Sequence, residues 1–153
     1  MKSAPLRFLL GAGCLLLAAC TPAAAEPQPP EIAYGQDLCA GCGMIISDAK
    51  FAAALLTSKN EALKFDDIGD MVLYALDHPD TQPKAWFVHD YESETWIRGE
   101  TAYYVVLPAG NSPMGSGLTA FSDLGAAKAF AVGWNVGLLR FDEMQAWVHE
   151  TLH

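Results

Sequence analysis

The sequence predicts an α+β protein made of two small ββαβ subdomains that are related by internal duplication. Three observations predict this fold: a repeated segment, the same order of strand-like and helix-like segments around each copy, and the chain length. The length of 153 residues accommodates one compact domain or two very small ones. Because one half alone could bury little apolar surface, we expect the two subdomains to pack together.

The repeat aligns residues 65–75 with residues 121–131 without gaps, at an offset of 56 positions. The identical pairs are Phe65/Phe121, Asp67/Asp123, Gly69/Gly125 and Ala75/Ala131. Each copy predicts a strand that ends at the Phe, an Asp or Ser N-cap and then a helix. In the first copy the spacing of Ile68, Met71, Val72 and Ala75 is typical of a buried helical stripe. Chance similarity of two capped helices is the alternative, and matching segments on both sides favour duplication.

The segments around the two copies give the order of elements. The expected strands are 51–57, 62–65, 85–91, 102–107, 117–121 and 136–140. The turn at 58–61 joins the first two strands, and His78, Pro79 and Pro83 end the first helix. A last helix is expected at 142–152, and the halves meet near 94–100. The predicted subdomains are therefore 31–93, which includes the cysteine segment, and 94–153.

The N-terminal segment predicts export. Lys2 and Arg7 precede an apolar run at 8–19, which is too short for an ordinary transmembrane helix and has the pattern of a secretory signal. The segment 17–20, Leu-Ala-Ala-Cys, resembles the bacterial lipobox, so we expect a lipoprotein signal at 1–19 and lipidation of Cys20. A plain signal peptide is the alternative. A Pro/Ala tether follows at 20–30.

The charge of the chain excludes one class of function and supports the anchor. A formal net charge of −9 excludes a general nucleic-acid binder, which needs a basic face. Removal of Lys2 and Arg7 with the signal would bring the charge to about −11. Such a surface does not adhere to anionic lipid, so a covalent anchor is needed to hold it at a bilayer. In known lipoproteins, which this segment resembles, an aspartate after the lipidated cysteine favours the inner membrane. Thr21 at this position therefore implies an anchor in the outer membrane, facing the periplasm.

Cys39 and Cys42 are the cysteines that remain after such processing. One disulfide is the simplest expectation for an exported domain, but a bridge across so short a loop stabilises little. Gly43 stands where a c-type haem motif needs histidine, and a four-thiolate zinc site lacks its second cysteine pair. No apolar strand precedes the motif, which argues against a thioredoxin-like site. An exported thiol–disulfide oxidoreductase that uses Cys39 and Cys42 stays as the alternative function.

Two methionines extend the motif toward metal chemistry. Thiolate and thioether are soft donors that together select Cu(I), and an extended Cys42-Gly-Met44 segment would place both sulfurs on one face. From the residues alone, a core methionine before Ile45 and Ile46 is the favoured interpretation of Met44. Met114 lies in the turn-rich segment 108–118. A methionine in such a loop is more often a gap-filling or an exposed apolar residue than a ligand, and the alternative is a third soft donor.

Together, these segments resemble the NosL family, lipoprotein accessory factors of nitrous-oxide reductase. The matching motifs are the lipobox, Cys39-Ala-Gly-Cys-Gly-Met44, Phe65-Asp-Asp-Ile-Gly69, Trp86-Phe-Val-His-Asp-Tyr91, Thr101-Ala-Tyr-Tyr-Val105, Pro113-Met-Gly-Ser-Gly117 and Phe121-Ser-Asp123. The resemblance implies a two-part fold related to the organomercurial lyases and a Cu(I) chaperone without catalysis. It also implies delivery to the membrane machinery that assembles the copper–sulfide centre of the reductase.

The resemblance implies Cys42, Met44 and Met114 as copper ligands. Cys39 is a further candidate whose role the resemblance leaves open, because some relatives lack this cysteine and have a histidine near the Cys-Gly-Met motif. A histidine ligand has been discussed for the family, and the candidates are His78, His89, His149 and His153. His89, in the expected strand 85–91, is the first choice among them, and a partly exposed strand residue without a metal role is the alternative.

Overall fold

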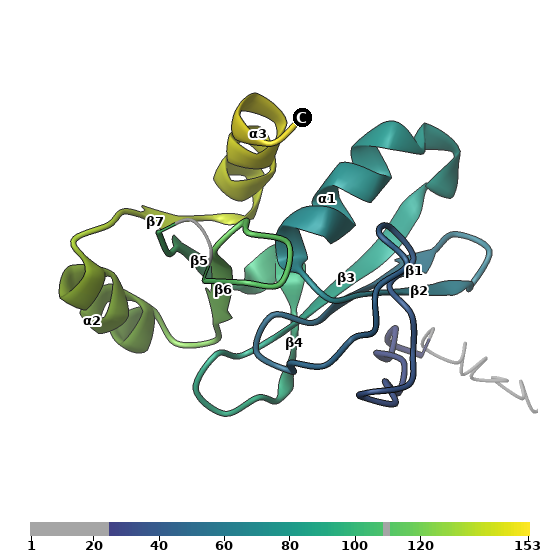
Figure 1. Ribbon diagram of the computed structural model, residues 1–153, viewed down its shortest axis with the longest axis horizontal. Coiled ribbons are helices and arrows are strands. Elements are labelled where there is room, and N and C mark those ends of the chain that lie inside the picture. The colour runs from purple at the N-terminus through teal and green to yellow at the C-terminus, as the bar shows by residue number, and fades with distance from the viewer. Residues whose placement is uncertain (1–24, 109–110) are drawn as a thin grey trace, which may run out of the picture.

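The computed structural model describes residues 25–108 and 111–153 (Figure 1). The predicted signal at 1–19 and the lipidation site Cys20 lie outside the described residues. Within these ranges, no helix has the length and apolar character that crossing a membrane requires. The described residues form a mixed α+β fold with two small antiparallel sheets and three helices, which confirms the predicted fold class.

The first sheet has four strands in the order β2-β1-β3-β4, all antiparallel. Its strands are β1 (Ala53–Thr57), β2 (Ala62–Phe65), β3 (Pro83–His89) and β4 (Trp96–Arg98). The sequence did not predict β4, which lies in the segment 94–100 where the halves were expected to meet. It has only three residues and pairs with the end of β3, for example Trp96 with His89. Strands this short give almost no periodic signal.

The second sheet has three strands in the order β6-β5-β7, again antiparallel. Its strands are β5 (Tyr103–Val106), β6 (Leu118–Phe121) and β7 (Leu138–Leu139). This order corresponds to β2-β1-β3 of the first sheet, with a helix after the second strand in both cases. The two halves therefore share one ββαβ topology, as the repeat predicts.

Three helices complete the fold: α1 (Ile68–Asp77), α2 (Leu124–Trp134) and α3 (Phe141–Thr151). The N-caps of α1 and α2 are Asp67 and Asp123, one residue later than the Asp or Ser position that the repeat suggested. The Asp two positions after the Phe is the cap in each copy, because its carboxylate accepts a backbone N–H of the first helical turn. Helix α1 ends at Asp77, and Pro79 follows its C-cap His78, as predicted.

One hydrophobic core is shared by both halves. It combines Ile68 and Met71 of α1 with Tyr104 and Leu118 of the second sheet, all fully buried. Helix α3 adds Met144 and packs against α1 (Figure 1). Neither half closes this core alone, so the packing of the two subdomains is a condition for stability.

The two sheets meet at the end of β3. The N–H of Tyr91 donates to the carbonyl of Ala120, at 2.8 Å, and the buried carboxylate of Asp90 accepts the backbone N–H and Oγ of Ser122, both at 2.8 Å. It also accepts the N–H and Oγ of Ser93, at 3.0 Å. Burial alone would raise the pKa of Asp90, but these hydrogen bonds outweigh it and hold the pKa at about 2. Asp90 is thus an ionised bridge between the two halves.

Candidate metal centre

Hydrogen bonds to the N-cap residue of α1 hold the loop that carries Met114. The fully buried carboxylate of Asp67 caps α1 by accepting the Gly69 N–H, at 2.7 Å. The same carboxylate accepts the hydroxyls of Ser112, at 2.6 Å, and Ser116, at 2.5 Å, and the backbone N–H of Met114, at 3.1 Å. One aspartate therefore connects the two halves and holds the loop beside α1 (Figure 1).

The loop and the helix approach each other too closely for a side chain at Gly69. A Cβ added at Gly69 would lie 2.5 Å from the Cβ of Ser116, which is shorter than carbon atoms tolerate. The glycine of the repeated motif thus has a packing role in the first copy. It lets the Met114 loop lie directly on the first turn of α1.

The cysteine segment forms a tight turn. The N–H of Cys39 donates to the carbonyl of Met44, at 2.8 Å, and the N–H of Gly43 donates to the carbonyl of Cys39, at 3.0 Å. Gly43 has a φ of 75°, so the extended Cys42-Gly-Met44 conformation considered from the sequence is wrong. A further hydrogen bond, from Ala40 N–H to the carbonyl of Lys64 at 2.8 Å, ties this turn to β2.

Two thiols and two carboxylates meet where this turn faces α1. The buried Cys39 Sγ donates to Asp70 Oδ2, at 2.8 Å, and the half-buried Cys42 Sγ lies 3.6 and 3.8 Å from the two carboxylate oxygens of Asp66. Both cysteines are free thiols, so the simple disulfide expectation is not met. One ligand atom from each of the four residues lies within 4.8 Å of all the others.

Burial dominates the electrostatics of this cluster. It raises the pKa of the Cys39 thiol, and the hydrogen bond to Asp70 raises it further. Burial also raises the pKa of the Asp70 carboxyl, and the nearby negative charges of Asp66 and Asp67 raise this pKa further. A raised thiol pKa makes Cys39 a poor nucleophile in the metal-free protein, which weakens the thiol–disulfide alternative.

Both candidate methionines are accessible. Met44 is 49% exposed and Met114 is 45% exposed, so neither is a core methionine, although the residues alone favoured that interpretation for Met44. Met114 also borders a hollow of about 170 Å³ together with Asp70 and Ser116. The loop that Asp67 holds therefore places Met114 at a hollow that Asp70 also lines.

The contacts of the candidate histidines are with residues other than the two cysteines. His89 is buried, and its two ring nitrogens lie 3.0 Å from the Ala52 carbonyl and 3.1 Å from the Tyr34 hydroxyl. Its ring packs on Trp96 with centroids 3.7 Å apart, and burial lowers its pKa. The partly exposed alternative is wrong, because His89 is buried and has the contacts of a core histidine, and its role as a ligand stays a prediction. The other three have different neighbours: His78 stacks on Tyr74, and His149 stacks on His153.

Sequence reasoning missed Asp66 and Asp70 as members of the site. Both were visible in the motif Phe65-Asp-Asp-Ile-Gly-Asp70, but a carboxylate before a helix is first interpreted as a cap. The available signal was the excess of acidic residues, since one carboxylate is enough to cap a helix and the motif has three.

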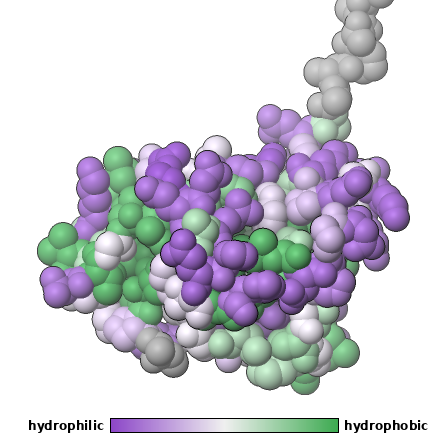
Figure 2. Space-filling view, turned by 90° about the horizontal axis from the view of Figure 1, so that it is seen from above, coloured by the Kyte–Doolittle hydropathy of each residue, from purple (hydrophilic) through white to green (hydrophobic). Residues whose placement is uncertain are grey.

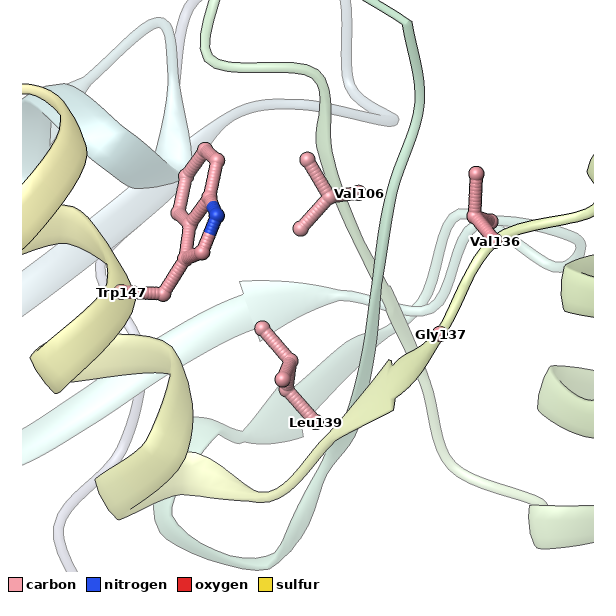
Figure 3. A pocket seen from close by; sticks show the side chains of 5 residues that line it. All are labelled: Val106, Val136, Gly137, Leu139 and Trp147. Carbon is pink, nitrogen blue, oxygen red and sulfur yellow. The ribbon is translucent and has the colours of Figure 1, made fainter.

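Two apolar features lie elsewhere on the surface. A hollow of about 330 Å³ between α3 and the second sheet is lined by Val106, Val136, Gly137, Leu139 and Trp147 (Figure 3). Hydrophobic side chains also gather at the end of the molecule that carries α2, where Val132 and Trp134 are exposed (Figure 2). The residues that line the hollow have neither a thiol nor a carboxylate.

Comparison with known proteins identifies the family. The sequence profile of the NosL family matches residues 31–148. The chain belongs to the NosL family. It is 30% identical over 131 residues to the copper-binding lipoprotein NosL of Stutzerimonas stutzeri, across 79% of this chain and 69% of the relative.

A solved structure supports the same relationship. The fold is similar to the crystal structure of the copper chaperone NosL from Shewanella denitrificans, with a TM-score of 0.67 and 26% identity. The match covers 77% of this chain and 96% of the Shewanella chain. One relative is thus named a copper-binding lipoprotein and the other a copper chaperone, which agrees with the prediction of a non-enzymatic copper protein.

Proposed function

We propose that this protein is a Cu(I) chaperone, lipid-anchored in the periplasm, that supplies copper for the copper–sulfide centre of nitrous-oxide reductase. The observation that carries the copper proposal is the attachment of the Met114 loop to α1 by Asp67. This attachment brings a soft thioether to the helix end where Asp66 meets the Cys42 thiol. The copper-binding and chaperone names of the relatives support the same conclusion.

The proposed ligands are Cys42, Met44 and Met114. One thiolate and two thioethers favour Cu(I) over harder cations, and neither thioether forms a disulfide outside the cytoplasm. All three residues are at least partly exposed, as a transfer site requires. With few protein ligands, a donor of the acceptor protein can bind the ion before it leaves, so copper moves by ligand exchange.

The proposed anchor and partner follow from the rest of the chain. Cys20 carries the lipid, and Thr21 after it directs the protein to the outer membrane. The acceptor is the membrane machinery that assembles the reductase's copper centre, and through it nitrous-oxide reductase itself. A mature charge of about −11 favours docking on a basic face of this partner.

Copper titration of the reduced chain in detergent tests the ligands. We expect Cys42→Ala to abolish stoichiometric Cu(I) binding and Met44→Ala and Met114→Ala each to weaken it by at least about tenfold. Leu38→Ala is the matched control, because Leu38 is exposed on the same turn and has no donor atom. If both methionine variants bind Cu(I) as tightly as the parent chain, the proposed sulfur site is wrong.

Three further measurements test the cellular role, the anchor and the alternative function. In a denitrifying host that lacks the chain, the reductase should lack its copper–sulfide absorption, and the wild type but not Cys42→Ala should restore it. Cys20→Ser should release the protein from the membrane fraction. In an insulin-reduction assay the protein should be inert, whereas turnover would favour the thiol–disulfide function.

A further inference from the structure

The end of α3 carries a histidine pair that the proposed function does not use. His149-Glu-Thr-Leu-His153 has the H-E-x-x-H spacing, in which two histidines four positions apart lie on one face of a helix and bind one ion. The two imidazole rings are stacked, with centroids 5.3 Å apart and an interplanar angle of 16°. The backbone N–H of His153 donates to the carbonyl of Val148, at 3.2 Å, which keeps the second histidine against the last turn of the helix.

A carboxylate from another helix meets this pair. Nε2 of His153 lies 3.1 Å from Oδ1 of Asp77, the last residue of α1. Bonds from imidazole nitrogen and carboxylate oxygen to a zinc-sized ion are about 2.0–2.2 Å long, so neighbouring donors around one ion lie roughly 2.8–3.5 Å apart. The separation of His153 and Asp77 is therefore already that of two ligands of one ion.

The backbone on both sides of these donors is fixed by packing. Met144 and Val148 of α3 are buried in the shared core, where α3 lies against α1. Asp77, His149 and His153 are exposed, so their side chains can turn toward an ion without disturbing that core. An ion held by all three residues would link the end of α1 to the end of α3.

The donor set determines which ion this place favours. Two imidazoles and a carboxylate contain no soft sulfur, so they favour a divalent first-row ion over Cu(I). Among the divalent ions they bind Cu(II) most tightly, since affinity rises along the first row to copper and falls again at zinc. Three protein ligands also leave a position open, through which the ion can be exchanged.

We propose that Asp77, His149 and His153 bind one Cu(II) ion. This goes beyond the proposed function, because none of the three is a proposed Cu(I) ligand. Leu152, which precedes His153, lines the hollow of about 170 Å³ that Met114 also borders, so the Cu(II) site lies next to the proposed Cu(I) site. The chain thus has separate ligands for the two oxidation states of copper on neighbouring parts of its surface.

Cu(II) titration followed by electron paramagnetic resonance tests the proposal. The full chain in detergent carries Cys39→Ser and Cys42→Ser, because free thiols would reduce or bind Cu(II). We expect one Cu(II) ion in this double-serine chain, with an axial signal and hyperfine coupling to imidazole nitrogen. His149→Ala and His153→Ala should each lower Cu(II) affinity by at least about tenfold, and Asp77→Asn should lower it severalfold.

His78→Ala is the matched control. His78 is exposed and follows Asp77 in the chain, but its ring stacks on Tyr74, so its removal should leave Cu(II) affinity unchanged. Cu(II) should raise the melting temperature of the His78→Ala variant but not of the His153→Ala variant, since the bound ion links the two helices. Equal Cu(II) affinity in the double-serine chain, His149→Ala and His153→Ala would overturn the proposal.

A Cu(I) titration separates this proposal from the proposed function. With both cysteines in place, His149→Ala should change Cu(I) affinity by less than about threefold, because the proposed Cu(I) ligands are all sulfur atoms. Failure of the sulfur site would appear as unchanged Cu(I) affinity in Met114→Ala, whatever the Cu(II) titrations give. A tenfold loss of Cu(I) affinity in His149→Ala would contradict the separation of the two sites.

Discussion

The two copies of the repeated motif have the same backbone and different chemistry. In both, a strand ends at a buried Phe, the Asp two positions later caps the following helix, and a glycine occupies the second helical position. The first copy, residues 65–69, forms one wall of the candidate metal centre. The second copy, residues 121–125, forms part of the junction between the sheets.

The residue after the Phe is Asp66 in the first copy and Ser122 in the second, and this difference gives the two copies different roles. Asp66 places a carboxylate beside the Cys42 thiol. Its counterpart Ser122 has no charge and donates its hydroxyl and N–H to Asp90 at the junction. A duplicated fold thus supplies two equivalent positions, and the neighbouring loops decide which becomes a site.

The loops are where the copies differ most. The β1–β2 connection is the short turn 58–61, whereas the β5–β6 connection runs from 107 to 117 and carries Met114. The longer loop reaches the first half, where its Ser112 and Ser116 hydroxyls donate to the Asp67 carboxylate. The site therefore needs both halves, and duplication of the ββαβ unit alone does not create it.

The largest expected effect separates the two capping aspartates. Asp67→Ala leaves Ser112, Ser116 and two backbone N–H groups without their acceptor, so we expect a loss of about 3–5 kcal/mol in the free energy of unfolding. Asp123→Ala removes one cap bond, to Ala126 N–H, and should cost about 1 kcal/mol. Urea denaturation of both variants measures the difference.

Copper binding adds a second measure to this comparison. Asp67→Ala releases the Met114 loop and should weaken Cu(I) binding by about tenfold or more, whereas Asp123→Ala should leave it unchanged. Asp67→Asn keeps the shape and one acceptor oxygen, and it serves where Asp67→Ala does not fold. Equal copper affinity in Asp67→Asn, Asp123→Ala and the parent chain would show that the loop is not part of the site.

The sequence was sufficient to predict the repeated topology because its signals are local. Helical spacing, capping residues and Pro79 define α1, and gap-free alignment transfers the pattern to α2. Strand ends were less accurate, since β7 has two residues where five were expected. The end of β3 at His89 instead of residue 91 has a tertiary cause, because Asp90 turns the chain to meet Ser122 and Ser93.

The site was only partly predictable for a related reason. Sulfur donors such as Cys42 and Met114 are recognisable by residue type alone. The partnership of Cys39 with Asp70, 31 positions apart, depends on how the turn packs on α1, for which no local pattern exists. The same holds for His89, whose contacts with Tyr34 and Ala52 span more than thirty residues.

The second prediction concerns the junction and its dependence on pH. Hydrogen bonding lowers the pKa of Asp90 in the folded protein to about 2, below its value in the unfolded chain. Its stabilisation of about 2 kcal/mol is therefore complete above about pH 4 and is lost as the pH falls through about 2. Asp90→Asn should be less stable than the parent chain by this amount at pH 6, and the two should converge near pH 2.

Ser122→Ala should cause a smaller loss of stability at the junction, and it also tests whether the junction is independent of copper binding. It removes the hydroxyl bond to Asp90 and keeps the N–H bond, so we expect a loss of about 1 kcal/mol. Neither junction variant should alter Cu(I) affinity, because Asp90 and Ser122 are not among the proposed metal ligands. A stability difference between Asp90→Asn and the parent chain that persists at pH 2 would contradict the assigned ionisation.

The smallest expected effect separates the two glycines of the repeat. A Cβ at Gly69 would lie 2.5 Å from Ser116 Cβ in the loop, whereas a Cβ at Gly125 meets only the Asp123 carboxylate of its own cap, at 3.0 Å. Replacing glycine by alanine should stabilise the helix itself by about 1 kcal/mol in both copies. At Gly69 this gain offsets part of an overpacking cost of about 1–3 kcal/mol, so Gly69→Ala should lower the free energy of unfolding by about 1 kcal/mol. Gly125→Ala should leave the free energy of unfolding nearly unchanged.

Copper affinity should reveal Gly69→Ala more clearly than stability does. The clash is relieved when Ser116 and the loop move away from α1, which displaces Met114 while the shared core stays intact. We therefore expect Cu(I) affinity to fall severalfold in Gly69→Ala and to stay unchanged in Gly125→Ala, measured by competition with a Cu(I) chelator. If both variants keep the parent affinity, close packing of the loop on α1 does not position the thioether. The hydrogen bonds to Asp67 would then position it alone.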